Sequence, residues 1–356
     1  MKILVIAGLV ASGAFGCSGS TAATGDAGTT NDNGVDSGTP GGGGTDGGMQ
    51  PPPPRGSFCV TFGPQAAAAS LENTQCVVKR LGNPTPMHMG SIHNVLSQGS
   101  HHMIVYRTND TVEQTTPFDC KPFTDTLDPT KGSTLMISQK KDDLLQLPDG
   151  VGYTLDANQM VRLEMHYINA GTSPIQIQGT STFIPIPDAS FKYEADFLFI
   201  GTPDIALPPK SKMTVGPMHI TLPSIYDGVN FFAMTGHEHQ YGTNVVVSTA
   251  TSLADPGTSV YNVPGWVWSE PATVVSNPTF QIPANGGFNF SCSYDNTSSA
   301  QVNFGESANA EMCFFWAYYY PSQGGARVCI HTDKVPGGVD ACCPGTSPAC
   351  AYIKSL

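Results

Sequence analysis

Two histidines separated by a single residue stand in the segment MTGHEHQYG, residues 234–242. Successive side chains of a β-strand alternate between its two faces, so His237 and His239 are expected to point the same way. Neutral imidazole is the commonest metal ligand in proteins, and two rings on one face make a ready ligand pair. The same spacing also occurs on the polar face of an ordinary strand, so the pair alone does not define a metal site.

Three further histidines lie earlier in the chain, in two segments with the composition of strands. GSHHMIVYR places His101 and His102 at the start of an apolar strand, and VRLEMHYIN places His166 on the polar face of another. Adjacent residues of a regular strand face opposite ways, so His101 and His102 can share one metal only if a bulge or the strand end turns one of them. Gly99 and Ser100 would permit such a bulge.

A methionine adds a second kind of metal donor. In EMCFFWAYYYP, Met312 stands beside Cys313. A thioether favours Cu(I), whereas zinc sites use histidine, cysteine and carboxylates. As a ligand, Met312 would therefore indicate redox chemistry, but a methionine before an aromatic run is also an ordinary core residue. A sixth histidine, His219 in GPMHITLP, has no evident partner.

The elements that would position these side chains are short strands. VVSTAT, QVNFG, FNFSCSY and HHMIVYR are rich in β-branched or aromatic residues and bounded by Gly, Pro, Asn or Asp. Only PQAAAAS (64–70) and DDLLQL (142–147) suggest helix. The body from residue 57 is too long for one ordinary sandwich, and FIPIPDASFKYEADF (183–197) interrupts it. We expect an all-β fold of two consecutive β-sandwiches, 57–190 and 191–327.

The N-terminal segment predicts export. Residues 1–16 carry Lys2 and then a short apolar run, which is typical of a secretory signal and too short to span a bilayer. The small residues before Cys17 resemble a bacterial lipoprotein cleavage site, with Cys17 as the lipidated residue. Residues 17–56, rich in Gly, Thr and Pro, are predicted to be a disordered tether. We therefore expect a cell-envelope or outer-membrane lipoprotein, or a secreted protein.

Ten cysteines fit an oxidising compartment. Nine remain without Cys17, an odd number, so at least one is free, pairs between chains or has another role. We interpret the Cys-rich tail, 328–356, as a disulfide-stapled appendage, and its spacing does not favour the alternative of a zinc site. The net charge of −12 argues against nucleic acid or an anionic membrane surface as partner.

Four of these motifs occur in a diagnostic order. HHM, LEMHY, HxH and EMC before an aromatic strand ending YYP resemble the type II copper, ascorbate-dependent monooxygenases, which include peptidylglycine α-hydroxylating monooxygenase and dopamine β-monooxygenase. LPDGVGY (147–153) and LPPKSKMTVGP (207–217) also agree. The resemblance covers roughly residues 75–327. It implies two jelly-roll-like sandwiches with two copper ions facing each other across an open, solvent-filled interdomain cleft.

Carried over by position, the resemblance assigns the ligands of both ions. His101, His102 and His166 would hold the copper that stores an electron. The catalytic copper, which activates dioxygen, would be held by His237, His239 and Met312. Disulfides Cys292–Cys313 and Cys76–Cys120 would brace the neighbouring strands.

The resemblance is weaker at the residues that bind the substrate in the peptide hydroxylase. The peptide hydroxylase holds its substrate's carboxylate with Arg, Asn and Tyr, where this chain has Thr235, Phe314 and Trp316. None of these supplies the bidentate contact of an arginine, so a peptidylglycine substrate is not expected. Phe314 and Trp316 are either an apolar wall of the site or core residues. Glu238, between the two ligands, is expected to face away from the metal and to be solvated or salt-bridged.

Two functions follow from these patterns. The first is a copper-dependent monooxygenase that hydroxylates a C–H bond of a small molecule, with O2 and a one-electron reductant such as ascorbate. Its membrane contact would be limited to the N-terminal lipid. The alternative is an exported lipoprotein that uses the same ligands to sequester copper without turnover. A purely structural or adhesive sandwich would require the four motifs to be accidental.

Overall fold

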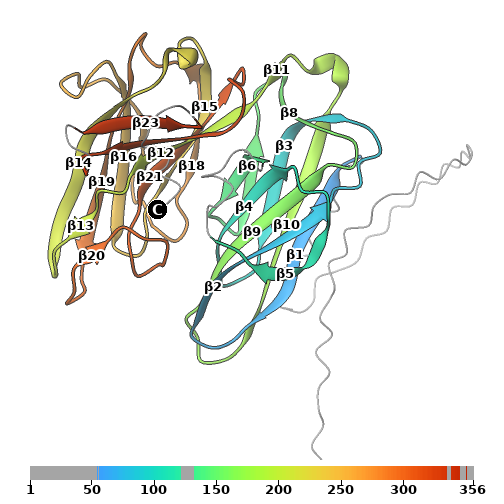
Figure 1. Cartoon of the computed structure of the whole chain (residues 1–356), viewed down its shortest axis with the longest axis horizontal. Helices are drawn as coiled ribbons and strands as arrows, with labels where there is room; N and C mark the ends of the chain where they lie inside the picture. Colours follow the sequence, from blue (N-terminus) through green and yellow to red (C-terminus); the bar gives the residue numbers. More distant parts are fainter. Residues whose placement is uncertain (1–53, 55, 122–131, 335–337, 345–349, 351–356) are drawn as a thin grey trace, which may run out of the picture.

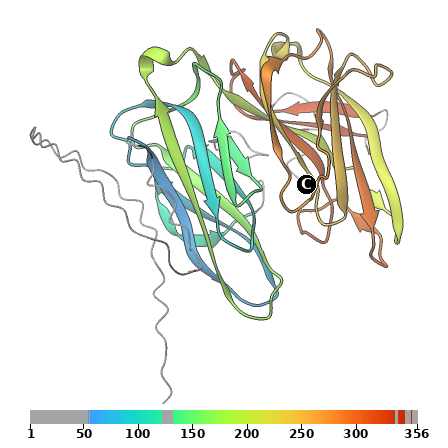
Figure 2. The ribbon, with the colours of Figure 1, turned by 180° about the vertical axis from the view of Figure 1, so that it is seen from behind.

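The computed structural model describes residue 54 and residues 56–121, 132–334, 338–344 and 350. They form two β-rich lobes that lie side by side (Figure 1), and the view from behind shows the same arrangement (Figure 2). The signal peptide, Cys17 and nearly all of the tether lie outside the described residues, so those predictions are untested.

The first lobe is a sandwich of two sheets with mostly antiparallel pairing. The outer sheet follows the order β1-β10-β3-β8-β11, with β7 beside β3. Its strands are β1 (Phe58–Ala67), β3 (Met87–Leu96), β7 (Asp142–Gln146), β8 (Val151–Leu155), β10 (Ile175–Ile186) and β11 (Tyr193–Glu194). The second sheet has the order β5-β2-β9-β4-β6. It consists of β2 (Leu71–Arg80), β4 (Ser100–Thr108), β5 (Gln114–Asp119), β6 (Gly132–Ser138) and β9 (Met160–Asn169).

The second lobe repeats this architecture with a six-stranded and a four-stranded sheet. The larger sheet, in the order β18-β15-β21-β12-β22-β23, is built from β12 (Asp196–Thr202), β15 (Asn230–His237), β18 (Thr273–Phe280), β21 (Cys313–Tyr320), β22 (Arg327–Thr332) and β23 (Val339–Cys343). The smaller contains β14 (Ser211–Thr221), β16 (Gly242–Ala250), β17 (Thr258–Asn262) and β19 (Gly287–Asn296). A short ladder joins β13 (Ala206–Leu207) to β20 (Val302–Asn303), and the 3-10 turns are η1 (Asp188–Ser190) and η2 (Ser224–Tyr226). The predicted all-β fold is confirmed.

Both stretches that suggested helix are strands, so that prediction was wrong. Residues 64–67 complete β1, which bulges between Phe62 and Gln65 and then continues its pairing with β10. Residues 142–146 form β7, in which exposed and buried side chains alternate strictly. Neither a run of alanines nor a pair of leucines shows a hydrophobic periodicity that distinguishes helix from strand. Hydrogen-bonded pairing with the neighbouring strand therefore determines the conformation.

The central strands of the second lobe's larger sheet, β12 and β21, are buried on both faces. Along β21, Phe314, Trp316 and Tyr318 join the hydrophobic cluster that contains the core of the first lobe, whereas Phe315 and Tyr319 join the core between the second lobe's own sheets. Such a strand reads as an unbroken apolar run, because neither face meets water. The aromatic segment CFFWAYYY therefore has two roles: it fills its own sandwich and it joins the two lobes through an apolar interface.

The disulfides Cys76–Cys120 and Cys292–Cys313 are confirmed. In the predicted tail, Cys329 pairs with Cys342 and Cys343 pairs with Cys350. No cysteine of the described residues is free. The described part of the tail is not an appendage either, because β22 pairs in parallel with β12 and β23 extends the same sheet.

Within the described residues, no helix has both the length and the apolar composition required to span a bilayer.

The Cys292–Cys313 bridge gives a prediction about stability. Replacing both cysteines by alanine should lower the free energy of unfolding by about 3 kcal/mol, because the bridge closes a loop across 21 residues. Replacing Cys343 and Cys350, which are only 7 residues apart, should cost about 2 kcal/mol, since a shorter loop restricts the unfolded chain less. Urea denaturation of the metal-free protein measures both. A larger loss for the tail pair would contradict this account.

Candidate metal centre

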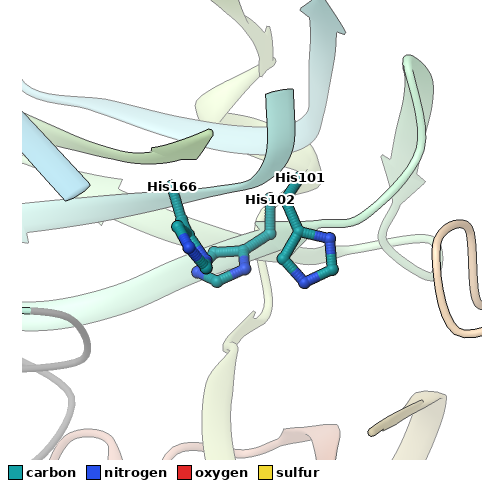
Figure 3. A group of neighbouring side chains, drawn as sticks. All are labelled: His101, His102 and His166. Atoms are coloured by element: carbon teal, nitrogen blue, oxygen red, sulfur yellow. The ribbon is translucent and has the colours of Figure 1, made fainter. Parts of the chain in front are cut away.

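Three histidines of the first lobe form a compact group. His101, His102 and His166 each offer a ring nitrogen, and these atoms all lie within 4.8 Å of one another. His102 and His166 stand directly opposite each other on β4 and β9, and the pairing shifts register between Ser100 and His102. The irregularity predicted at this point is confirmed, and it lets adjacent histidines turn to the same side. Figure 3 shows the three rings gathered on one side of their strands.

The second group lies at the end of β15. His237 is the last residue of the strand and His239 follows it, with ring centroids 5.1 Å apart and ring planes perpendicular. His239 is in the turn after the strand, where the backbone N–H of Gly242 donates to its carbonyl. The two rings therefore converge because a strand ends between them, not because they share the face of a regular strand.

The two groups meet across the interface between the lobes. The ring of His101 lies 6.2 Å from that of His237 and 6.1 Å from that of His239, centroid to centroid, and His102 lies 5.8 Å from His237. His101 is 6% exposed, and the other four rings are 0–2% exposed. The expectation of an open, solvent-filled cleft was therefore wrong for this structure. The apolar face of β21 and β12 packs against the first lobe and closes the space.

Three of the five rings have one nitrogen occupied by a protein acceptor. His166 Nε2 lies 3.0 Å from Glu72 Oε1, His237 Nδ1 lies 2.5 Å from Gln139 Oε1, and His239 Nδ1 lies 3.2 Å from the carbonyl of Ala310. A carboxylate or carbonyl oxygen can only accept, so in each pair the imidazole donates. A neutral ring that donates from one nitrogen presents a lone pair at the other, which is how metal-ligating histidines are usually held.

Three buried ring nitrogens of the centre indicate what it binds. His101 Nε2, His166 Nδ1 and His239 Nε2 are buried and make no hydrogen bond to the described residues. Buried polar atoms are nearly always satisfied, so three such atoms at one place require a partner. Metal–nitrogen bonds are about 2 Å long, so ligand atoms separated by up to 4.8 Å need only small ring rotations to share an ion. The residues fit a metal centre.

Burial sets the protonation of the rings. It lowers the pKa of His101, His102 and His237 well below the usual value, and the neighbouring imidazoles lower it further. Burial also lowers the pKa of His239 to about 4. These rings are therefore neutral at pH 7, the form that binds metal.

Glu72 links the two lobes at this centre. Its carboxylate accepts from His166 in its own lobe, and from the N–H of Ala308 (2.8 Å) and the hydroxyl of Ser307 (3.1 Å) in the other. The hydrogen bond from His166 is the main reason why the pKa of Glu72 falls to about 2. Glu72 thus orients a ligand and holds the segment that leads to residues 310–312.

Glu311 holds that segment against the His239 turn. Its buried carboxylate accepts from the backbone N–H groups of His239 (2.8 Å), Tyr241 (2.7 Å) and Met312 (3.3 Å). Burial raises the pKa of Glu311 to about 7. Met312 is 3% exposed and packs within the interdomain hydrophobic cluster. Its backbone is therefore tied to the histidine turn, while the role of its sulfur as a ligand remains a prediction.

Glu238 differs from expectation. It is fully buried, not solvated, and no ion pair involving it occurs among the described residues. Burial raises the pKa of Glu238 well above its usual value, and the nearby Glu311 adds to the effect. A Cβ at Gly242 would come within 2.5 Å of its carboxylate, so a glycine is required there to make room.

Three other histidines, His219, His88 and His93, have partners away from the centre. His219 contacts the Asn289 side chain, with 2.7 Å between Nδ1 and Oδ1. His88 stacks on Phe191 at 3.7 Å, and His93 pairs with Asp142 at 2.6 Å.

Thr235, Phe314 and Trp316 stand where the peptide hydroxylase has its carboxylate-binding residues, and all three pack against other side chains. Thr235 Oγ1 lies 2.8 Å from Thr273 Oγ1. Phe314 stacks on Phe199 at 4.6 Å, and the ring of Trp316 lies 5.5 Å from that of His237. Phe314 and Trp316 are core residues of the lobe interface, and Trp316 also borders the centre.

Sequence reasoning missed Gln139, Glu72 and Glu311. Glu311 had a signal, since it precedes Met312 in the EMC motif. Gln139 and Glu72 had none, because docking of one lobe on the other brings Gln139 to His237, and the pairing of β2 with β9 brings Glu72 to His166.

The second lobe matches the model of a known protein family. Residues 193–335 match the family model described as copper type II ascorbate-dependent monooxygenase, C-terminal domain, and this segment contains His237, His239 and Met312. No curated protein matches the chain.

Solved structures are only distantly similar. The major capsid protein P2 from bacteriophage PM2 is 9% identical, with a TM-score of 0.33 over 76% of this chain and 99% of that one. A peptide-N(4)-(N-acetyl-beta-D-glucosaminyl) asparagine amidase is 10% identical, with a TM-score of 0.30 over 75% of this chain and 98% of that one. Similarities this weak carry no argument.

The lowered pKa values predict an unusual pH dependence of metal binding. Protons compete for a ring only as the pH approaches its pKa, so a lowered pKa moves the competition to lower pH. Because His239 has a pKa of about 4, we expect copper(II) affinity to change little between about pH 7.5 and 5.5 and to fall steeply below about pH 5. Equilibrium dialysis measures this, with a free His-x-His peptide as control. A steep loss of affinity starting near pH 6.5, as in the peptide, would refute the lowered pKa values.

Proposed function

We propose that the chain is a copper type II, ascorbate-dependent monooxygenase, whose family model matches residues 193–335, and that it hydroxylates a C–H bond of a small molecule. The co-substrates would be O2 and a one-electron reductant such as ascorbate. One observation carries the proposal: the two histidines of the family's domain meet three histidines of the first lobe in a single buried centre.

We assign two copper ions to this centre. His101, His102 and His166 would hold one, and His237, His239 and Met312 the other. Copper, when bound, supplies one-electron redox chemistry and activates dioxygen. Imidazole suits copper in either oxidation state, and a thioether at the second ion favours Cu(I).

The chain's own residues prepare the ligands. Glu72, Gln139 and the Ala310 carbonyl hold protons at the outer nitrogens of His166, His237 and His239, which leaves the inner nitrogens for metal. Glu311 ties Met312 to the His239 turn. Burial excludes water from the rings, which protects reactive species from side reactions.

The surroundings indicate the kind of substrate. Thr235 contacts Thr273, Phe314 is stacked on Phe199, and Trp316 borders the centre beside His237, so none of the three supplies a cation. A substrate whose recognition depends on a carboxylate would find no guanidinium at these positions. We therefore expect an uncharged, apolar or aromatic substrate.

One observation favours copper sequestration without turnover as a second candidate. All five rings are at most 6% exposed, so copper held among them would be shielded. Oxygen consumption by copper-loaded protein with ascorbate, tested against benzylic and aliphatic substrates, distinguishes the two. Consumption coupled to hydroxylated product supports the enzyme. Stoichiometric copper without coupled turnover on any substrate supports sequestration.

We also propose that the protein is exported, as a cell-envelope lipoprotein or in secreted form. An oxidising compartment is supported by the signal-like residues 1–16 and by disulfides among the described residues, which include Cys76–Cys120, Cys292–Cys313, Cys329–Cys342 and Cys343–Cys350. Mass spectrometry of the mature N-terminus tests the anchor, and an unmodified residue other than Cys17 there would exclude lipidation.

Met312 gives the sharpest prediction of the proposed activity. Met312→Ile should abolish hydroxylation, because it removes the only proposed sulfur ligand, while copper at His101, His102 and His166 stays bound. Product formation and copper content per chain measure the two effects. Met234→Ile is the matched control, since Met234 is a fully buried core residue on β15. Full turnover in the Met312 variant would show that the sulfur is not a ligand.

A further inference from the structure

We propose that Gln139, in the first lobe, is a positioning residue for His237 in the second, and that the second copper site is complete only when the lobes are packed together. This inference rests on the proposed function to the extent that His237 is taken as a copper ligand. It does not depend on turnover.

The contact is a two-point clamp. Gln139 follows β6 directly and is 3% exposed. Its Oε1 lies 2.5 Å from His237 Nδ1, and its Nε2 donates to the carbonyl of Gly236 at 3.1 Å. One side-chain amide thus holds two consecutive residues at the end of β15.

The clamp defines which atoms donate. The Gly236 carbonyl can only accept, so the NH2 end of Gln139 must face it. The opposite orientation would place two oxygens 3.1 Å apart without a hydrogen between them. Gln139 Oε1 therefore faces His237, and the ring must donate from Nδ1. This tautomer leaves the lone pair on His237 Nε2.

The clamp crosses the interface between the lobes. Gln139 is supplied by the first lobe, while His237 and Gly236 belong to β15 of the second. An isolated second lobe would retain His237 without its acceptor. Outer hydrogen-bond partners of metal-ligating histidines fix the ring and its tautomer, and their loss typically weakens metal binding by 10–100-fold.

A neighbouring bond provides a matched control. The backbone N–H of Ile137, two residues before Gln139, donates to Tyr318 Oη at 3.1 Å. It joins β6 to β21, the strand that pairs with β15, but touches no histidine that we assign to copper. Tyr318→Phe removes this cross-lobe bond and leaves the ring in place.

The test measures copper affinity at one site. In a full-length His101→Ala, His166→Ala background, only the site of His237, His239 and Met312 remains. Chelator competition gives its affinity, and electron paramagnetic resonance of Cu(II) reports the ligand field. We expect Gln139→Leu to weaken binding about 10–100-fold and to change the spectrum. Gln139→Glu keeps an acceptor for His237 Nδ1–H, and as a protonated carboxylic acid it can still donate to the Gly236 carbonyl, so it should restore affinity to within a few fold of the parent.

Each outcome is decisive. A Gln139→Leu protein with the parent's affinity and spectrum overturns the positioning role and leaves the proposed function intact. Equal weakening by Gln139→Leu and Tyr318→Phe also overturns it, because the effect would then come from lobe packing alone. If the parent binds no copper at this site while the wild-type chain binds only one ion, the two-copper proposal itself fails.

Discussion

The structure depends on placing five imidazole rings in an interface that excludes water. A buried imidazole is tolerable only if it is uncharged and its nitrogens are satisfied. Burial enforces the first condition, as the lowered pKa values of His101, His102, His237 and His239 show. Protein acceptors meet the second condition at one nitrogen of His166, His237 and His239. What remains is a set of inward lone pairs that a metal would satisfy.

The apolar interface between the lobes makes this burial possible. Phe314, Trp316 and Phe199 pack on the first lobe's core, so the sheet that carries His237 is docked by ordinary hydrophobic contact. Lobes joined by a hydrophobic interface are expected to move less against each other than lobes joined by polar contacts. The hydrogen bonds of Glu72 and Gln139 then fix the details within this packing. Fold stability and ligand geometry therefore share one surface.

Much of the centre could be predicted from the sequence because its chemistry is local. The HH pair after Gly99 and the alternation around His166 each predict a side chain's direction on a strand. The HxH pair predicts two neighbouring rings, although they converge because β15 ends at His237. The irregularity at Ser100 and His102 followed from adjacent histidines that must face the same way. Cys292 and Cys313 lie on β19 and β21, and the expected bridge between them is present.

The predictions from sequence were wrong where tertiary contacts determine the local structure. The alanines of residues 64–70 favour helix and residues 142–147 have no strong preference, but pairing with β10 and β3 makes most of each stretch a strand. Glu238 was expected to be solvated because it is charged in water, but the fold buries it beside Gly242 and Glu311. The closed interface and the roles of Gln139 and Glu72 depend on how the lobes dock, which no spacing along the chain encodes.

Copper content per chain tests the central claim most directly. The account predicts two copper ions on the wild-type protein and one on each of two double variants, His101→Ala with His166→Ala and His237→Ala with His239→Ala. Each variant should lose a different component of the Cu(II) paramagnetic resonance spectrum. A single ion on the wild type, or loss of all copper in both variants, would show that the five rings do not form two sites.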